Sequence, residues 1–402
     1  MLDLLIRGGT VIDGTGAPGF SADVAVEGGV IAAVEPLPPD TPARRVIHAA
    51  GKLVTPGFID IHCHADAAAF RPGFGELELR QGLTTIVNGN CGLSAAPFGP
   101  AHREEILAYL APITGEAPPE LETETLAGYF ASQPPAPIHT GMLVGAGVLR
   151  ADAAGYALQR LEKRHYDAIH RSMERALSDG AVGVSLGLGY APECFYTTRE
   201  LIEALRPLSG GDVPVTVHMR QEGAGVVDSV REMLTVARTL RIPLQISHLK
   251  LMGRPQWGRS RELLDKLAAA RREGLNVTCD QYPYTATSTS MTALVPKWAH
   301  DGGRAALLER LRDPSRQLKA EIAAEMEDRG GADRVMIAGT HGCRPEWEGR
   351  TVAELAEELK LSPADTVVHA LDCCGGRVAC IYFSIDEGDM LNIMKDMDIA
   401  VG

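Results

Sequence analysis

The sequence predicts an α/β protein in which a (β/α)8 barrel of the TIM type follows a small N-terminal β-sandwich unit. Short apolar runs alternate with longer amphipathic segments from about Leu53 onward, and eight such runs occur. This order is typical of parallel strands joined by crossover helices. Eight repeats favour a closed barrel, and an open doubly wound sheet is the alternative.

Residues 1–52 have a different pattern from the rest of the chain. Three short runs of strand-forming residues lie at 4–6, 23–26 and 30–34, and the glycines and prolines between them indicate turns. This pattern predicts a small β unit of hairpins, followed by the barrel domain over 53–402.

The eight predicted barrel strands lie at 58–62, 84–88, 142–145, 182–186, 213–218, 244–248, 275–279 and 398–401. Between them, the stretches 158–179, 224–240 and 259–273 carry apolar residues at helical spacing.

Two segments interrupt the alternation of strand and helix. Residues 93–138 contain proline-rich pieces and two short helical stretches, and residues 283–345 contain a charged helical run over 305–329. Insertions between a barrel strand and the next helix lie at the C-terminal rim, where barrel active sites form. We therefore predict that 283–345 is an insertion that acts as an active-site flap, with plain surface decoration as the alternative.

The composition excludes some classes of function. The formal net charge of the 402 residues is −13, which argues against nucleic acid as a partner, because binding phosphates needs clustered lysine and arginine. No apolar stretch is long enough for a membrane span, and the N-terminal residues lack the pattern of a signal peptide. The eight cysteines are scattered without zinc-ribbon spacing, so we expect reduced thiols in a cytoplasmic protein.

A histidine pair closes the first predicted barrel strand. His62 and His64 flank Cys63, and alternate residues of a strand face the same side, so both imidazoles can converge on one ion. Such a pair taken alone is more often incidental. Here the run from Pro56 to Asp60 leads directly into it, and Asp66 follows.

Two further histidines end predicted strands. His218 closes the fifth strand and His248 closes the sixth, and the C-terminal ends of barrel strands point into one mouth. Four imidazoles around one cavity are hard to explain as packing, since each would need its own partner when buried. The pattern therefore indicates a metal site.

Cys91 lies at the same rim, in the glycine-containing turn Asn88-Gly89-Asn90-Cys91-Gly92 after the second strand. A small buried thiol is the ordinary role of a free cysteine, but a thiolate at this place would be a strong zinc ligand. Many barrel hydrolases bridge two metals with a carboxylated lysine on the fourth strand. The run 182–187 has no lysine, and Cys91 could take its place.

These motifs resemble the amidohydrolase superfamily. The resemblance is carried by the opening run 4–14 and by the run 56–64, which ends in His62-Cys63-His64. The runs Gly89-Asn90-Cys91-Gly92, His218-Met219-Arg220 and Ser247-His248-Leu249-Lys250 are similar, more narrowly, to the N-acyl-D-amino-acid deacylases, or D-aminoacylases. The similarity extends along the whole chain.

The resemblance implies a ligand set and a substrate. A tightly held Zn2+ would lie on Cys91, His218 and His248, and a weaker second Zn2+ would lie on His62 and His64 and share Cys91. The substrate would be a small N-acyl amino acid whose hydrolysis releases a free D-amino acid.

The resemblance also implies the residues that hold the substrate. Its carboxylate would contact Lys250 and Tyr282, with Tyr190 as a further candidate and Tyr284 as a competing tyrosine. Lys250 follows His248 by two residues, so a continuing strand would place both on one side, and a solvated surface lysine is the alternative.

The proton shuttle of this family is an aspartate in a Ser-Asp-Gly step at the end of the last barrel strand. The last predicted strand is followed directly by Gly402, and the expected aspartate would lie two positions later. No catalytic residue can therefore be assigned in 1–402. We expect a truncated chain, with an incomplete sandwich and crippled catalysis, that still binds zinc.

Two other functions remain open. One is a different amidohydrolase, either a cyclic-amide hydrolase or a deaminase. The missing lysine on the fourth strand argues against the former, and Lys250 would have no purpose in the latter. The other is a non-catalytic zinc-binding barrel, which the expected truncation keeps open. The sequence leaves neutral, glutamate and aspartate side chains open for the substrate.

Overall fold

A computed structural model describes residues 1–402, and the chain divides into two compact units. The first comprises Met1–Ile59 with Gly82–Thr84, and the second comprises Asp60–Gln81 with Thr85–Gly402. None of the helices is both long and apolar enough to cross a bilayer.

The first unit contains one five-stranded sheet in the order β3-β2-β1-β4, with β5 also paired to β1. The strands are β1 (Leu4–Val11), β2 (Phe20–Glu27), β3 (Val30–Glu35), β4 (Val46–His48) and β5 (Leu53–Val54). The predicted hairpins are present, because β1–β2 and β2–β3 pair antiparallel. A β-sandwich requires two sheets, whereas this unit forms a single sheet. Its residues Val30, Ile31 and Leu53 are exposed.

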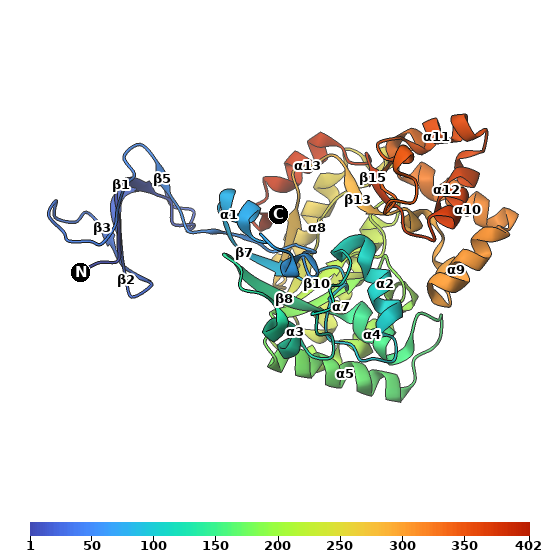
Figure 1. Ribbon diagram of the computed structural model, residues 1–402, viewed down its shortest axis with the longest axis horizontal. Coiled ribbons are helices and arrows are strands. Elements are labelled where there is room, and N and C mark those ends of the chain that lie inside the picture. Colours follow the sequence, from blue (N-terminus) through green and yellow to red (C-terminus); the bar gives the residue numbers. More distant parts are fainter. The chain divides into compact units, whose positions relative to one another are not determined.

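The barrel sheet has eight strands in the order β16-β12-β11-β10-β9-β8-β7-β6. They are β6 (Phe58–Asp60), β7 (Leu83–Asn88), β8 (His139–Gly145), β9 (Gly183–Gly187), β10 (Val215–His218), β11 (Leu244–Ile246), β12 (Val277–Gln281) and β16 (Ile399–Val401). Of these, β7, β8 and β10 are labelled in Figure 1. All eight overlap the predicted strands, so the predicted barrel class is confirmed. The two edge strands of the sheet approach each other. A Cβ built on Gly402, which follows β16, would lie 3.4 Å from Oδ1 of Asp60, the last residue of β6.

The central strands of the barrel sheet are buried on both faces. All residues of β9 and β11 are buried, as parallel strands covered by crossover helices require. Apart from those within residues 287–382, the helices of the second unit are α1 (Glu76–Arg80), α2 (Arg103–Thr114), α3 (Leu126–Ser132), α4 (Ala146–Ala154), α5 (Lys163–Ser178), α6 (Thr198–Ala204), α7 (Val226–Leu240), α8 (Ser260–Arg272) and α13 (Glu387–Met394). The three helices predicted from periodicity correspond to α5, α7 and α8. Of these, α5 begins later than predicted, at a capping box between Glu162 and His165.

An inserted layer separates β12 from α13. We use this name for residues 287–382, which form the sheet β13-β15-β14 and four helices. Its elements are β13 (Thr287–Ser290), α9 (Gly303–Arg312), α10 (Arg316–Asp328), β14 (Val335–Gly339), α11 (Val352–Leu359), α12 (Pro363–Cys373) and β15 (Ala379–Tyr382). The four helices group together in orange and red in Figure 1. The boundary drawn from the sequence at 345 falls inside this layer, between β14 and α11.

The inserted layer has a hydrophobic core of its own. Buried side chains such as Leu294, Ile322, Val335, Leu371 and Tyr382 form one cluster. The barrel core is a separate cluster, to which the chain returns at Ile393 and Ile399. The layer is thus an independently packed body inserted between a barrel strand and the next helix.

Candidate metal centre

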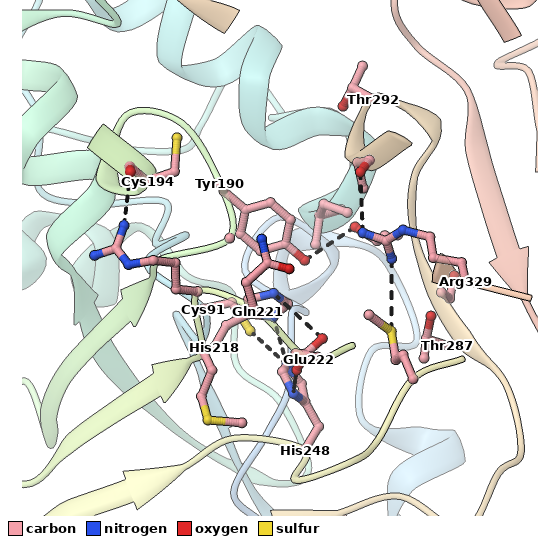
Figure 2. Close-up of a pocket in the computed structure, with 18 of the residues that line it drawn as sticks. Cys91, Tyr190, Cys194, His218, Gln221, Glu222, His248, Thr287, Thr292 and Arg329 are labelled. Atoms are coloured by element: carbon pink, nitrogen blue, oxygen red, sulfur yellow. Dashed lines mark hydrogen bonds and ion pairs between the residues drawn. The ribbon is translucent and has the colours of Figure 1, made fainter. Parts of the chain in front are cut away.

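The five predicted metal ligands lie together in two sets that share Cys91. One set is His62, His64 and Cys91, the other is Cys91, His218 and His248, and the ligand atoms of each set lie within 4.8 Å of one another. The Sγ atom of Cys91 is 3.4 Å from Nε2 of His62 and 3.5 Å from Nε2 of His248. Nδ1 of His218 is 3.0 Å from Nε2 of His248. Cys91, His218 and His248 converge in Figure 2.

The ligands come from the ends of four barrel strands, although fewer of them belong to strands than predicted. His218 is the last residue of β10. His62 and His64 follow β6, which ends at Asp60, and His248 follows β11, which ends at Ile246. His248 has a φ of +38°, so the strand does not continue through it to Lys250.

Cys91 is held by an unusual turn after β7. Its φ is +57°, a left-handed conformation that non-glycine residues seldom adopt. Gly89 and Gly92 on either side also have positive φ. A Cβ on Gly92 would lie 2.0 Å from Oε2 of Glu193 and 2.8 Å from the backbone nitrogen of Gly187, so the turn is packed too closely for a side chain there.

Ser185 on β9 holds this turn in place by two hydrogen bonds. Its Oγ accepts a hydrogen bond from the backbone N–H of Gly92 at 3.0 Å and donates to the carbonyl oxygen of Gly89. The fourth barrel strand, which has no bridging lysine, therefore contributes a serine that fixes the turn bearing Cys91. A buried hydroxyl that both donates and accepts is fully satisfied.

The donor set fits a zinc ion. Nδ1 of His64 is buried without a hydrogen-bond partner, which is the condition of an atom that lacks its ligand. Burial opposes ionisation of the Cys91 thiol, but His62 and hydrogen bonds from His218 and His248 outweigh it and hold its pKa well below the usual range. One thiolate with imidazole nitrogens is a typical zinc donor set.

Two buried carboxylates contact the predicted ligands, and neither is predicted from the sequence. Asp280 on β12 has Oδ1 3.2 Å from Nδ1 of His62 and accepts the backbone N–H of His248 at 2.6 Å. Glu222, in the loop after β10, has Oε1 3.0 Å from Nδ1 of His248. Their only signal in the sequence is that each follows or lies in a predicted strand near a ligand.

The predicted substrate residues surround a cavity of about 420 Å³ above the ligands. Nζ of Lys250 lies 5.6 Å from the centroid of the Tyr282 ring, and the Tyr190 ring lies 4.5 Å from the His218 ring. The hydroxyl oxygen of Tyr190 also lies 3.3 Å from Oγ1 of Thr289, which belongs to the inserted layer. Tyr284 is 66% exposed, so of the two competing tyrosines Tyr282 is the one enclosed beside the ligands.

Lys250 is more constrained than a surface lysine. Its side chain is 2% exposed, and Nζ donates to Oε1 of Glu222 at 2.6 Å and to the carbonyl oxygen of His248 at 2.9 Å. Burial alone would raise the pKa of Glu222, but Lys250 and the two histidines hold it well below the usual range. The alternative of a solvated lysine is excluded.

The inserted layer forms one wall of the cavity. Lining residues lie within 287–300 and at 325–329, opposite the barrel residues that bear the ligands. Among them, Arg329 donates to the carbonyl oxygen of Ala293 at 3.2 Å and approaches Sδ of Met252 at 3.9 Å (Figure 2).

Comparisons with known proteins agree with this geometry. A family model described as "Amidohydrolase family" matches residues 45–370. A D-aminoacylase of Alcaligenes xylosoxydans xylosoxydans is 35% identical over 408 residues, covering 100% of this chain and 74% of that protein. An N-acyl-D-glutamate deacylase of the same organism is 36% identical, covering 100% of this chain and 73% of that protein.

A solved structure is also similar to this chain along its whole length. The N-acyl-D-glutamate deacylase of Bordetella bronchiseptica, complexed with zinc and a phosphonate inhibitor that mimics the tetrahedral intermediate, matches with a TM-score of 0.82 and 32% identity. The match covers 100% of this chain and 75% of that chain.

Proposed function

Because the chain belongs to the D-aminoacylase family of metal-dependent amidohydrolases, we propose that it uses Zn2+ to hydrolyse N-acyl-D-amino acids to a carboxylate and a free D-amino acid. The observation that carries the proposal is Cys91, a thiol shared by two histidine pairs at the floor of a cavity. The named relatives act on substrates of this class.

Cys91, His218 and His248 would hold one zinc ion tightly, and His62 and His64 would hold a second one more weakly while sharing Cys91. A zinc ion held by these residues would supply Lewis acidity for the amide carbonyl and a nucleophile at neutral pH. The protein's own part is to place the substrate and to keep the ligands fixed.

Lys250, Tyr282 and Tyr190 would hold the free carboxylate of the substrate. A cation close to the metal selects substrates with an acid group, since a charge-assisted hydrogen bond is stronger than a neutral one. The inserted layer would cover the bound substrate as a flap, because its residues 287–300 and 325–329 line the cavity. Carbonyl, carboxylate and side chain held at three points distinguish the D from the L enantiomer.

The test compares N-acetyl-D-methionine with N-acetyl-L-methionine on the zinc-loaded protein. Binding is measured by calorimetry and release of the amine is measured in the same samples. A preference for the D enantiomer in either measurement supports the proposal. Equal treatment of both enantiomers, or no binding and no release, contradicts it and favours another amidohydrolase or a zinc-binding barrel without this activity.

A further inference from the structure

Glu222 joins the metal ligands to the substrate lysine. Its side chain is buried, with 5% of the residue exposed, in the loop after β10. Oε1 lies 2.6 Å from Nζ of Lys250 and 3.0 Å from Nδ1 of His248, and Oε2 lies 3.8 Å from Nε2 of His218. One carboxylate thus faces two predicted zinc ligands and the predicted substrate lysine.

The hydrogen bonds of His248 cannot all persist when its ring binds a metal. Nε2 of His248 faces Cys91 and His218, so a metal there leaves the proton on Nδ1. Nδ1 then needs an acceptor, and the carboxylate of Glu222 is one, whereas an ammonium group is only a donor. Yet Nζ of Lys250 lies 2.8 Å from the same Nδ1 atom.

A metal on Nε2 therefore changes the partners of Lys250. Its ammonium group has three N–H donors, and in this structure they face Glu222, the carbonyl oxygen of His248 and Nδ1 of His248. When Nδ1 carries a proton, the third donor loses its acceptor. Lys250 lines the cavity, so that donor is available to a ligand there.

We propose that Glu222 is a positioning residue that orients His248 toward the metal and, through the same oxygen, makes a donor of Lys250 available to a carboxylate once metal is bound. Metal and carboxylate then favour each other's binding, and this coupling is reciprocal. The inference rests on the proposed function only in taking Cys91, His218 and His248 as the metal ligands and Lys250 as the carboxylate contact.

The test measures zinc affinity and carboxylate binding separately on the whole protein. Zinc affinity is measured by competition with a chromophoric chelator, and the Co2+-loaded protein reports the thiolate bond of Cys91 by its absorption. N-acetylglycine serves as the carboxylate probe, with and without zinc. It has no chirality, so failure of the D-amino-acid proposal leaves this test unaffected.

Three variants separate positioning from general damage. We expect Glu222→Gln to weaken zinc binding by about 10- to 100-fold, the usual effect of removing a ligand's hydrogen-bonded partner, and to abolish the effect of zinc on N-acetylglycine binding. Glu222→Asp should recover part of both. Lys250→Met should retain zinc affinity while losing N-acetylglycine binding, which a collapsed site would not do.

Glu325→Gln is the matched control, because Glu325 lines the same cavity from α10 without contacting the ligands, so its zinc affinity should remain that of the unaltered protein. Unaltered zinc affinity in Glu222→Gln would overturn the proposal. So would equal N-acetylglycine binding with and without zinc in the unaltered protein.

Discussion

Nδ1 of His62 lies 3.2 Å from Oδ1 of Asp280. His62 follows β6 and Asp280 lies on β12, and these two strands are six positions apart in the order of the barrel sheet. Replacing Asp280 with asparagine removes the charge that orients His62. We expect zinc affinity at the set His62, His64 and Cys91 to fall about 10- to 100-fold, while the set with His218 and His248 changes less. Zinc titration with two resolved affinities measures this.

The control for Asp280→Asn is Asp398→Asn, at a half-exposed carboxylate paired with Arg271. If the two substitutions weaken zinc binding equally, orientation of His62 by Asp280 is not the cause.

Cys91 belongs to both ligand sets, so its replacement should affect both. We expect Cys91→Ser to lose stoichiometric zinc, because a neutral hydroxyl replaces the thiolate in each set. Metal analysis after dialysis measures this. The control is Cys194→Ala, another buried cysteine that lines the cavity, and retention of zinc by Cys91→Ser would refute the shared ligand.

Gly92 should tolerate no side chain. We expect Gly92→Ala to destabilise the fold by more than the roughly 1–3 kcal/mol of a strained backbone conformation, because its Cβ would also collide with Glu193. Gly274→Ala is the matched control, since Gly274 also has a positive φ but nothing lies within 4 Å of its Cβ position. Urea unfolding measures both, and equal losses would exclude a role for the contact with Glu193.

Glu193 should make stability depend on pH. Burial raises the pKa of Glu193 from 4.5 to about 8, against the N–H of Gly187 and the charge of Arg150. The folded protein thus holds this proton more tightly than the unfolded chain. The stabilising effect of this bound proton on the fold is complete below about pH 4.5 and is lost as the pH rises to about 8.

Glu193→Gln keeps an acceptor for the N–H of Gly187 and removes the titration. We expect it to gain stability relative to the unaltered protein between pH 5 and 8.5, by about 1.4 kcal/mol for each unit by which the pKa is raised. Urea unfolding across this range measures the difference, with exposed Glu174→Gln as control. Parallel pH profiles of the unaltered protein and Glu193→Gln would show that Glu193 ionises normally.

Arg329 should favour substrates with an acidic side chain. It lines the cavity from the end of α10, and its Nε is buried without a hydrogen-bond partner. A carboxylate there would gain a charged hydrogen bond, so we expect Arg329→Met to weaken N-acetyl-D-glutamate binding about 10-fold and to change N-acetyl-D-methionine binding little. Calorimetry with both ligands measures this, and equal effects would exclude side-chain recognition by Arg329.

The parts of the fold that follow from periodicity could be predicted. All eight barrel strands and the helices α5, α7 and α8 have patterns that depend on nearby residues alone, and the five candidate ligands lie where parallel strands end. Lys250 lies beside His248 as expected, but not on a continuing strand, because His248 adopts a left-handed conformation and the strand ends before it. Both residues lie in the loop after β11, where Nζ of Lys250 is 2.8 Å from Nδ1 of His248.

The carboxylates behind the ligands could not be predicted. Glu222 lies in a loop without periodicity, and its contact with His248 joins residues 26 positions apart through tertiary structure. Ser185 is an ordinary strand residue in the sequence. Its hydrogen bond with the backbone of the turn that bears Cys91 becomes evident only from the structure. The extent of the inserted layer was not predicted, because nothing in the pattern of residues 346–382 assigns α11, α12 and β15 to it.

The inserted layer and the barrel bury separate cores, yet both line one cavity. A substitution in the layer's wall therefore alters the cavity without removing a side chain from the barrel core. Recognition of the substrate's side chain and the hydrolytic chemistry can be altered independently in such a chain. Exchange of residues 287–382 between relatives would transfer preference for a side chain while leaving the reaction itself unchanged.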